Sequence, residues 1–341
     1  MRPGCPGRGG QTKSSAYSRD LLREYFEAVT SLAAKMEKQL GFVLLRAFAT
    51  VRKNPKELVS ALRIIEREEK ADEDCAAKMK QTGFLPPGRP KRWREVCMAR
   101  LQRAVEDKIE GNQLESREEG KMWLVRHLEV IRMVMLEDLR IAKHHLAPCF
   151  PPRYNISQHC ISLYHGAVAA RLQDIIGKGL EGQEYVSLLQ WVLQTYPGPE
   201  LMGSPALGLE RHLVPPLLTE AAVDRLTGSY LANMRDNYNS WMTNTIRAEK
   251  EEWCSDRDPD MDFDGFFHTS SPVIIYQMVD ENLQVMVVIP KVVMVLMMVM
   301  IVMMVMMVIM GRMNKLLQVS ATISQELVYK VLLLGIEQVT R

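Results

Sequence analysis

The chain has 341 residues, enough for two or more helical units. Its 43 basic residues nearly balance its 41 acidic ones, and a formal net charge of +2 excludes the strong basic excess typical of proteins that bind nucleic acid through bulk charge. The six cysteines are scattered and form no C-x-x-C pair, which indicates free thiols in a reducing compartment.

The N-terminal part predicts a disordered tail followed by two helices. Residues 1–16 are polar and rich in Gly and Pro, with no apolar segment of a secretory signal peptide. From Tyr17 to Lys53 the pattern is helical, and Asn54-Pro55 separates it from a second helix that ends near Lys80. The apolar residues expected to face the core of the first helix are Leu21, Tyr25, Val29, Leu32, Met36 and Leu40, then Val43, Leu44, Phe48 and Val51.

A Pro/Gly-rich loop at 82–90 leads into a short basic run around Trp93. The run could contact anionic lipid or nucleic acid, or it could be a solvated loop anchored by Trp93. Four charges in a near-neutral chain favour the solvated loop. A helix over Trp93–Glu110, ended by Gly111, is expected next. The candidate lipid-contact residues are Arg89, Lys91, Arg92 and Arg94.

The central stretch Glu115–Ala147 predicts one long helix. Ser116 and Glu119 form a capping box at its start, and Pro148 stops it. One predicted face recurs at steps of three and four: Leu124, Leu128, Ile131, Met135, Leu139, Ala142 and Leu146. A second seam comprises Trp123, Val130, Val134 and Ile141. Two apolar seams indicate that this helix has neighbours on more than one side.

The rest of the chain is also predicted to be helical. Helices are expected over Tyr154–Lys178, Glu184–Tyr196 and Leu217–Glu252. We assign 17–196 to one helical bundle region, 197–216 to a Pro/Gly-rich joint and 217–284 to a second helical region. The predicted packing residues are Ile156, Cys160, Leu163, Ala167, Ala170 and Ile175, then Val186, Leu189, Trp191 and Leu193, then Leu218, Ala222, Leu226, Tyr230, Met234, Trp241, Ile246 and Trp253.

No catalytic or metal-binding pattern emerges from the sequence. The stretch Asp260–Gly265 resembles the start of an EF-hand loop, but Ser271 stands where the bidentate Glu should be. His144 and His145 point to different faces of one helix, and His127 is expected to be a packed residue. We find no nucleotide, hydrolase or metalloprotease signature. We therefore predict no enzyme, no cofactor, no metal and no small-molecule substrate.

One segment has an unusual composition. Of the 23 methionines, many crowd into 285–318, where the 19 residues 292–310 are uninterruptedly apolar. This run is long enough for a transmembrane span, but it lacks the aromatic anchors common at bilayer interfaces. Our hypothesis is that 285–318 is a low-complexity insertion read through from non-coding sequence. Residues 319–341 would then continue a helix whose end is truncated.

Several collinear segments resemble the exocyst complex component three family, including its component-three-like members. They carry packing and turn residues rather than a catalytic signature. They are ALRIIEREEK (Ala61–Lys70), KQTGFLPPGRPKRW (Lys80–Trp93), GKMWLVRHLEVIR (Gly120–Arg132), CFPPRY (Cys149–Tyr154), SLLQWVLQTY (Ser187–Tyr196) and QMVDENLQV (Gln277–Val285).

The resemblance implies an all-α fold, an elongated rod of stacked antiparallel helical bundles of the tethering-complex type. It also implies a non-enzymatic subunit that tethers secretory vesicles to the plasma membrane before SNARE-mediated fusion. The implied partners are other exocyst subunits and SNARE proteins, with peripheral contact to anionic membrane and no nucleic acid. The implied location is the cytoplasm, at exocytic sites of the plasma membrane. The alternative is a helical protein anchored in a membrane by 292–310.

Overall fold

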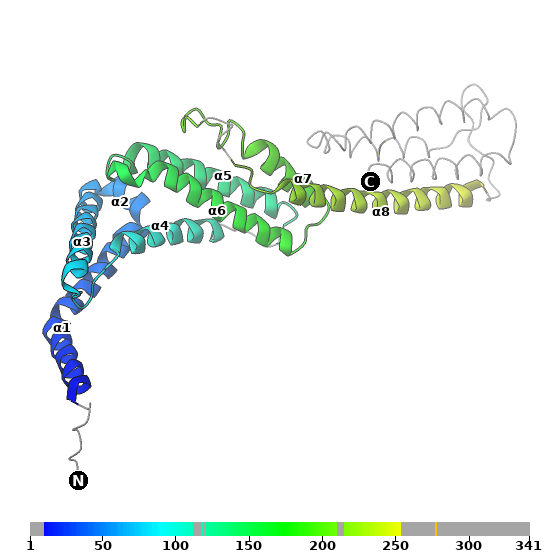
Figure 1. Cartoon of the computed structure of the whole chain (residues 1–341). Helices are drawn as coiled ribbons and strands as arrows, with labels where there is room; N and C mark the ends of the chain where they lie inside the picture. Colours follow the sequence, from blue (N-terminus) through cyan, green and yellow to red (C-terminus); the bar gives the residue numbers. More distant parts are fainter. Residues whose placement is uncertain (1–9, 112–116, 119, 210–214, 254–276, 278–341) are drawn as a thin grey trace, which may run out of the picture. The chain divides into compact units, whose positions relative to one another are not determined.

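The computed structural model describes residues 10–111, 117–118, 120–209, 215–253 and 277. Over these ranges the chain forms helices joined by turns and loops and contains no strand, so the predicted all-α class is confirmed (Figure 1). The EF-hand-like stretch and the insertion at 285–318 lie outside the described residues.

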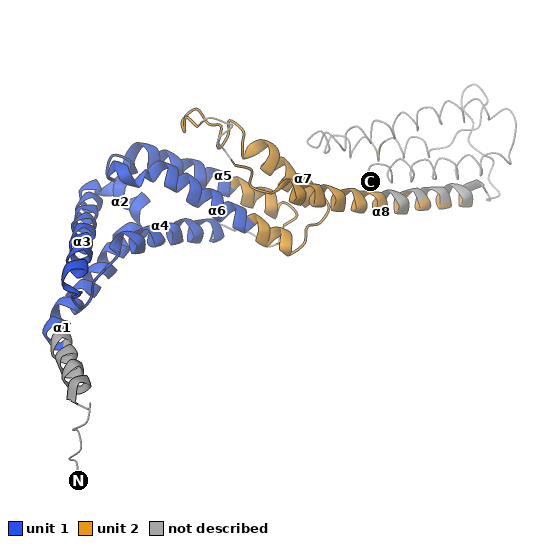
Figure 2. Cartoon of the chain, viewed as in Figure 1, with its two compact units in different colours: residues 1–113, 130–171 blue, residues 114–129, 172–341 orange. Residues whose placement is uncertain are grey.

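The chain divides into two compact units (Figure 2). Unit 1 comprises residues 1–113 and 130–171, and unit 2 comprises residues 114–129 and 172–341. The two helices α5 and α6 therefore contribute residues to both units. The predicted joint at 197–216 lies within unit 2.

Unit 1 opens with four helices whose ends follow local sequence signals. Pro55 stands at the first turn of α3, where its missing N–H costs nothing, and Gly83 ends that helix with φ 71°. The predicted bounds of α4 are confirmed, whereas α1 begins earlier than the expected Tyr17. The four are α1 (Gly10–Leu45), α2 (Ala47–Lys53), α3 (Pro55–Thr82) and α4 (Trp93–Glu110).

The predicted core face of α1 is only half right. Leu40 and Leu44 are buried, as expected. Tyr25, Val29 and Leu32 are not: their exposed fractions are 78%, 60% and 59%. On the neighbouring face of α1, Phe26 is half-buried and Gly88 of the 83–92 loop lies beside Thr30. The spacing of apolar residues located one stripe of the helix but could not show whether that stripe has a neighbour.

The central helix α5 (Trp123–Ile141) is shorter than predicted and is continued by one π-helical turn, η1 (Ala142–Leu146). The expected start at Glu115 is wrong, because 117–118 and 121–122 form turns. Both capping-box residues lie outside the described ones. The main buried face is confirmed at all seven positions from Leu124 to Leu146. In the second seam Trp123 and Ile141 are buried, whereas Val130 and Val134 are half-buried.

After the short 3₁₀ turn η2 (Pro152–Tyr154), helix α6 (Ile156–Gly177) buries three of the six predicted residues, Ile156, Cys160 and Ile175. Ala170 is exposed, and Leu163 and Ala167 are only half-buried. The buried residues are Ile156, Cys160, Tyr164, Val168, Leu172 and Ile175. The stripe advances by four residues after Cys160 because Tyr164, not Leu163, enters the core.

Tyr164 enters the core to bond a buried carboxylate. Asp138 of α5 accepts hydrogen bonds from the Tyr164 hydroxyl of α6 and from Lys108 Nζ of α4. The Lys108 ammonium also lies 4.6 Å from the centre of the Phe48 ring of α2. Burial and the Asp138 charge raise the pKa of Tyr164, so its hydroxyl remains a donor. This cluster joins four helices of unit 1.

Unit 2 contains α7 (Gln183–Gln190), the π-helical turn η3 (Trp191–Thr195) and α8 (Glu220–Trp253). The Tyr185 ring of α7 lies 6.2 Å from the Tyr230 ring of α8. Two packing predictions fail, because the side chains of Leu193 and Trp241 are exposed.

The loop predicted as a joint is packed. Leu201, Met202 and Leu207 are buried. In α8 the predicted Leu226, Tyr230 and Met234 are buried, and so is Leu218, just before the helix begins; Ala222 is half-buried. The side chains of Ile246 and Trp253 lie outside the described ones.

The fully buried face of α5 gives a direct stability test. Replacing Ile131 by Ala removes buried methyl groups and leaves a cavity, so we expect a loss of about 2–5 kcal/mol in the free energy of unfolding. The matched control is Met133→Ala on the same helix, whose side chain is exposed. Denaturant unfolding followed by circular dichroism measures both. Equal unfolding midpoints for the two variants would contradict the placement of this face in the core.

Candidate interaction surface

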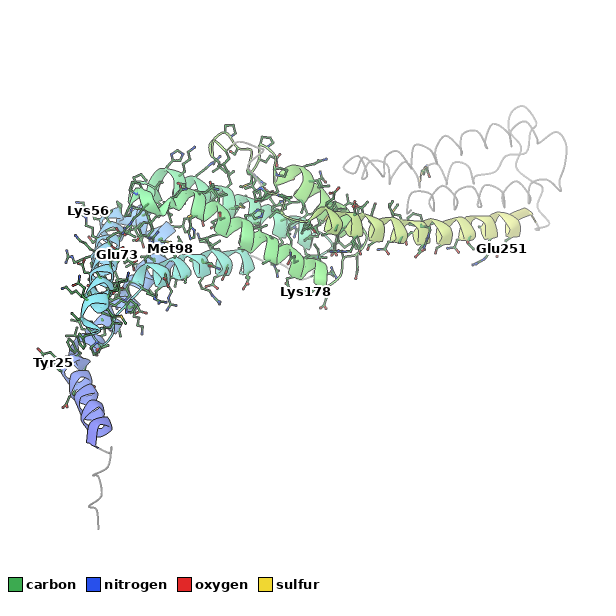
Figure 3. All side chains as sticks on the ribbon, in the orientation of Figure 1. Tyr25, Lys56, Glu73, Met98, Lys178 and Glu251 are labelled. Atoms are coloured by element: carbon green, nitrogen blue, oxygen red, sulfur yellow. The ribbon has the colours of Figure 1, made fainter. Side chains whose placement is uncertain are left out.

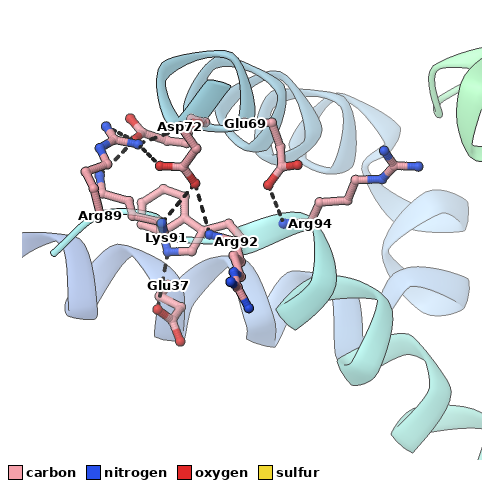
Figure 4. A network of polar contacts seen from close by, with 9 residues as sticks. Glu37, Glu69, Asp72, Arg89, Lys91, Arg92 and Arg94 are labelled. Atoms are coloured by element: carbon pink, nitrogen blue, oxygen red, sulfur yellow. Dashed lines mark hydrogen bonds and ion pairs between the residues drawn. The ribbon is translucent and has the colours of Figure 1, made fainter. Parts of the chain in front are cut away.

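The predicted basic run is bound to helix α3 by a network of ion pairs (Figure 4). Arg89 donates through Nη1 to Asp72 Oδ1 at 2.5 Å and through Nη2 to Glu68 Oε2 at 2.7 Å. Lys91 Nζ donates to the same Glu68 oxygen at 2.8 Å. The side chains of Arg89 and Lys91 are only 17% and 16% exposed. Two of the four basic side chains are therefore neutralised within the chain.

Backbone groups of the same loop are held as well. Asp72 Oδ2 accepts the amides of Lys91 at 2.9 Å and Arg92 at 3.0 Å. The hydrogen bond to the Arg92 amide helps to hold this residue at φ 52°, in the left-handed region that non-glycine residues seldom adopt. The Trp93 indole donates to Glu37 Oε2 of α1 at 3.2 Å. The loop 83–92 is thus fastened to α3 and, through Trp93, to α1. Trp93 is the anchor that the sequence favoured, whereas Arg89 and Lys91 are paired with acids of α3 rather than solvated. Lipid contact by Arg89, Lys91, Arg92 and Arg94 stays a prediction.

A third acidic residue of α3 holds the turn η2. Glu66 accepts hydrogen bonds from Arg153 and from the Tyr154 hydroxyl, the latter at 2.7 Å. The Arg94 guanidinium covers the Tyr154 ring at 4.6 Å, a cation–π contact. Arg94 therefore also serves the packing of unit 1.

These anchors depend on ionised carboxylates. Burial raises the pKa of Glu68, but the hydrogen bonds and charges of Lys91 and Arg89 outweigh it, and the pKa falls below its usual 4.5. The pKa of Glu66 is lowered in the same way, against burial, by Arg153 and Tyr154. A lowered carboxyl pKa stabilises the fold above the unfolded-state pKa and stops doing so as the pH falls through the folded-state pKa. We expect the anchors to weaken only in acid.

In unit 2 a buried glutamate, which the sequence did not predict, also anchors neighbouring elements. Glu184 accepts Arg117 Nε and Nη2 at 3.0 and 2.6 Å and the Trp123 indole N–H at 2.6 Å. Arg117 Nη2 also donates to the Gly179 carbonyl at 2.6 Å. This cluster fixes the start of α5 against the start of α7. Nothing in the spacing of Glu184 distinguishes it from a solvated helix residue.

The surface most suited to a partner is the exposed seam of α1, which we define as Tyr25, Val29, Leu32 and Met36. These four positions advance by four, three and four residues and span about 60° of the helix at about 100° per residue. This is the spacing by which one helix packs against another in a coiled coil. Tyr25, labelled in Figure 3, projects outward from α1. Met36 is half-buried, so the seam borders the packed face of the helix.

The described residues offer no competing chemical centre. They contain no group of three metal-ligating side chains, and none of their helices is long and apolar enough to cross a bilayer. The stretch 292–310 lies outside them. The four cysteines described are free, and burial raises the pKa of Cys97 and Cys160 to about 12, which leaves both as unreactive thiols. His127 is buried and stacked on Trp123, the packed role expected of it.

Comparison with known proteins assigns the chain to a family. The family model of exocyst complex component Sec6 matches residues 26–325. The chain belongs to this Sec6 family. It is 45% identical over 330 residues to exocyst complex component 3 of Drosophila melanogaster, which covers 96% of this chain and 40% of that protein. It is 33% identical over 273 residues to the Caenorhabditis elegans component 3, covering 77% of the chain and 34% of that protein.

Other relatives agree with this assignment. The component 3-like protein of Danio rerio is 31% identical over 291 residues, covering 83% of this chain and 37% of that protein. The crystal structure of M-Sec has the same fold, with a TM-score of 0.55 at 18% identity, and covers 88% of this chain and 55% of that one. The chain spans about two fifths or less of the length of these curated relatives.

The anchoring of the 83–92 loop can be tested by proteolysis. Asp72→Asn removes the charge that holds Arg89 and two backbone amides, so the loop should open more often. Because a hydrogen bond to a charged group contributes about 1.5–3 kcal/mol, we expect trypsin cleavage after Lys91 and Arg92 to be about tenfold faster. The control is Asp74→Asn, which removes an exposed carboxylate from the same helix. If both variants were cut at the wild-type rate, Asp72 would not hold the loop.

Proposed function

We propose that this chain is a non-enzymatic subunit of the exocyst and that it acts through helix–helix contacts. Membership of the Sec6 family supports an exocyst role, and the exposed seam of α1 is the observation that supports this mode of action. Exposure of an apolar seam to water is unfavourable, and the free energy falls when another helix covers the seam. A non-enzymatic role agrees with the family and with the sequence, which carries no catalytic motif.

The seam specifies the chemistry of its partner. Val29 and Leu32 would fill the holes of a facing helix, and Tyr25 would add a large ring at the edge. The facing helix must therefore be amphipathic, with its own apolar residues at steps of three and four. We infer that it belongs to another exocyst subunit.

The wider role follows from that assembly. We propose that the assembled subunit helps to tether secretory vesicles at the plasma membrane before SNARE-mediated fusion. Contact with SNARE proteins, and a location in the cytoplasm at exocytic sites, are parts of the same proposal. The second candidate, a helical protein anchored by 292–310, rests on hydropathy alone. Extraction of the expressed chain from membranes with alkaline carbonate separates the two, because a true span resists it.

Charged substitutions in the seam test the assembly role. A Val29→Asp, Leu32→Asp double variant places two carboxylates in the contact, and we expect co-purification of other exocyst subunits to fall at least about tenfold. The control is Phe42→Asp, which is also exposed on α1 but on another face. Thermal unfolding shows whether each variant still folds. Undiminished co-purification of a folded double variant would rule out the seam as the contact.

A further inference from the structure

Helix α3 sorts its charges between two faces. Its sequence is rich in both signs, but the acids Glu66, Glu68 and Asp72 are drawn into the anchors of η2 and of the 83–92 loop. Glu69 also accepts the amide of Arg94. Along the line from Lys56 to Lys70 the remaining exposed charges are basic, whereas the exposed acids Glu57, Glu73 and Asp74 lie beside this line or beyond its end.

We define the α3 basic stripe as Lys56, Arg63, Arg67 and Lys70. All four are exposed, and among the described residues none has an ion-pair partner within 4.0 Å. At about 100° per residue they fall within about 60° of one another, and they extend over about 21 Å. Glu57 and Asp74 mark the two ends of the stripe. Lys56, labelled in Figure 3, lies on the side of α3 that faces away from α1 and α4.

We propose that the α3 basic stripe binds the surface of a membrane that contains anionic lipids. A helix lying on a flat surface touches it along one line, and the stripe is such a line. Four basic side chains are only the lower limit of the clusters that recognise acidic lipids, but here, unlike Arg89 and Lys91, none is paired with a carboxylate of the described residues. This inference goes beyond the proposed exocyst function and does not depend on it, because it concerns the isolated chain.

An acidic protein helix is the other anionic surface that could fit, and the structure favours it less. Protein interfaces depend on buried apolar anchors, and exposed ion pairs alone add little. Among the described side chains of α3, Met79 is the one large apolar group that is exposed, and it lies nine residues beyond Lys70. The stripe thus offers charge without anchors, which suits adsorption to lipid headgroups.

The absence of apolar anchors on the stripe predicts how membrane binding depends on salt. With no apolar side chain to insert, the attraction is purely electrostatic and extends only over a Debye length. Binding should therefore weaken steeply as salt is added. Each cation near an anionic surface strengthens binding about fivefold, so removing two should weaken it about 25-fold.

The test measures sedimentation of the purified 341-residue chain with phosphatidylcholine vesicles, with and without phosphatidylserine. We expect binding only when phosphatidylserine is present, and about 25-fold weaker binding by an Arg63→Gln, Arg67→Gln double variant. The matched control is Arg103→Gln with Lys178→Gln. It removes the same charge from side chains that are 66% and 67% exposed and already paired with carboxylates. The control should bind like the wild type.

Four outcomes would overturn the proposal. They are binding that does not require phosphatidylserine, binding that survives high salt, equal losses in the double variant and the control, and tighter binding to poly-glutamate than to vesicles at the same salt. The last would assign the stripe to an acidic protein partner. Because Arg63 and Arg67 are exposed, thermal unfolding of the double variant should match the wild type. Failure of exocyst co-purification would leave these vesicle results unchanged.

Discussion

Unit 1 depends on a single buried charge. Asp138 has almost no exposed surface, and a carboxylate in such a place costs free energy unless donors surround it. Tyr164 and Lys108 supply those donors from α6 and α4, and Phe48 of α2 packs against both of their side chains. Because the donors come from different helices, the carboxylate is satisfied only when α4, α5 and α6 are in register. The cluster thus specifies one packing among the many that apolar seams alone would allow.

A similar arrangement recurs at three other places among the described residues. Asp72 holds a proline-rich loop, Glu66 holds η2, and Glu184 holds the start of α5 in unit 2. In each case a partly or fully buried acid accepts bonds from an arginine or lysine side chain and from a second kind of donor. Charge-assisted bonds of this kind are about twice as strong as neutral ones, so short segments can be fixed without an extensive apolar surface.

Local sequence patterns predict much of this fold. The residues whose burial they do not predict have identifiable physical causes. The face of α5 was predictable at every position from Leu124 to Leu146, because that helix is packed along its whole length. The stripe of α6 was not, because a hydrogen bond to Asp138 draws in Tyr164 in place of Leu163. The burial of Glu184 depends on Arg117, which is 67 residues away in sequence. The basic run at 89–94 looked free for the same reason, since its acids lie on α3.

The two unoccupied surfaces of unit 1 differ in the force that would fill them. The seam of α1 is apolar, so excluded salts and osmolytes strengthen its association. The α3 basic stripe is charged, so added salt weakens its contacts. Both surfaces arise because a helix that serves one neighbour retains the opposite or adjoining face for another. A fold built from such helices leaves faces available at its margins, and in α1 and α3 the available faces carry different chemistry. Contacts through them can therefore be separated by ionic strength alone.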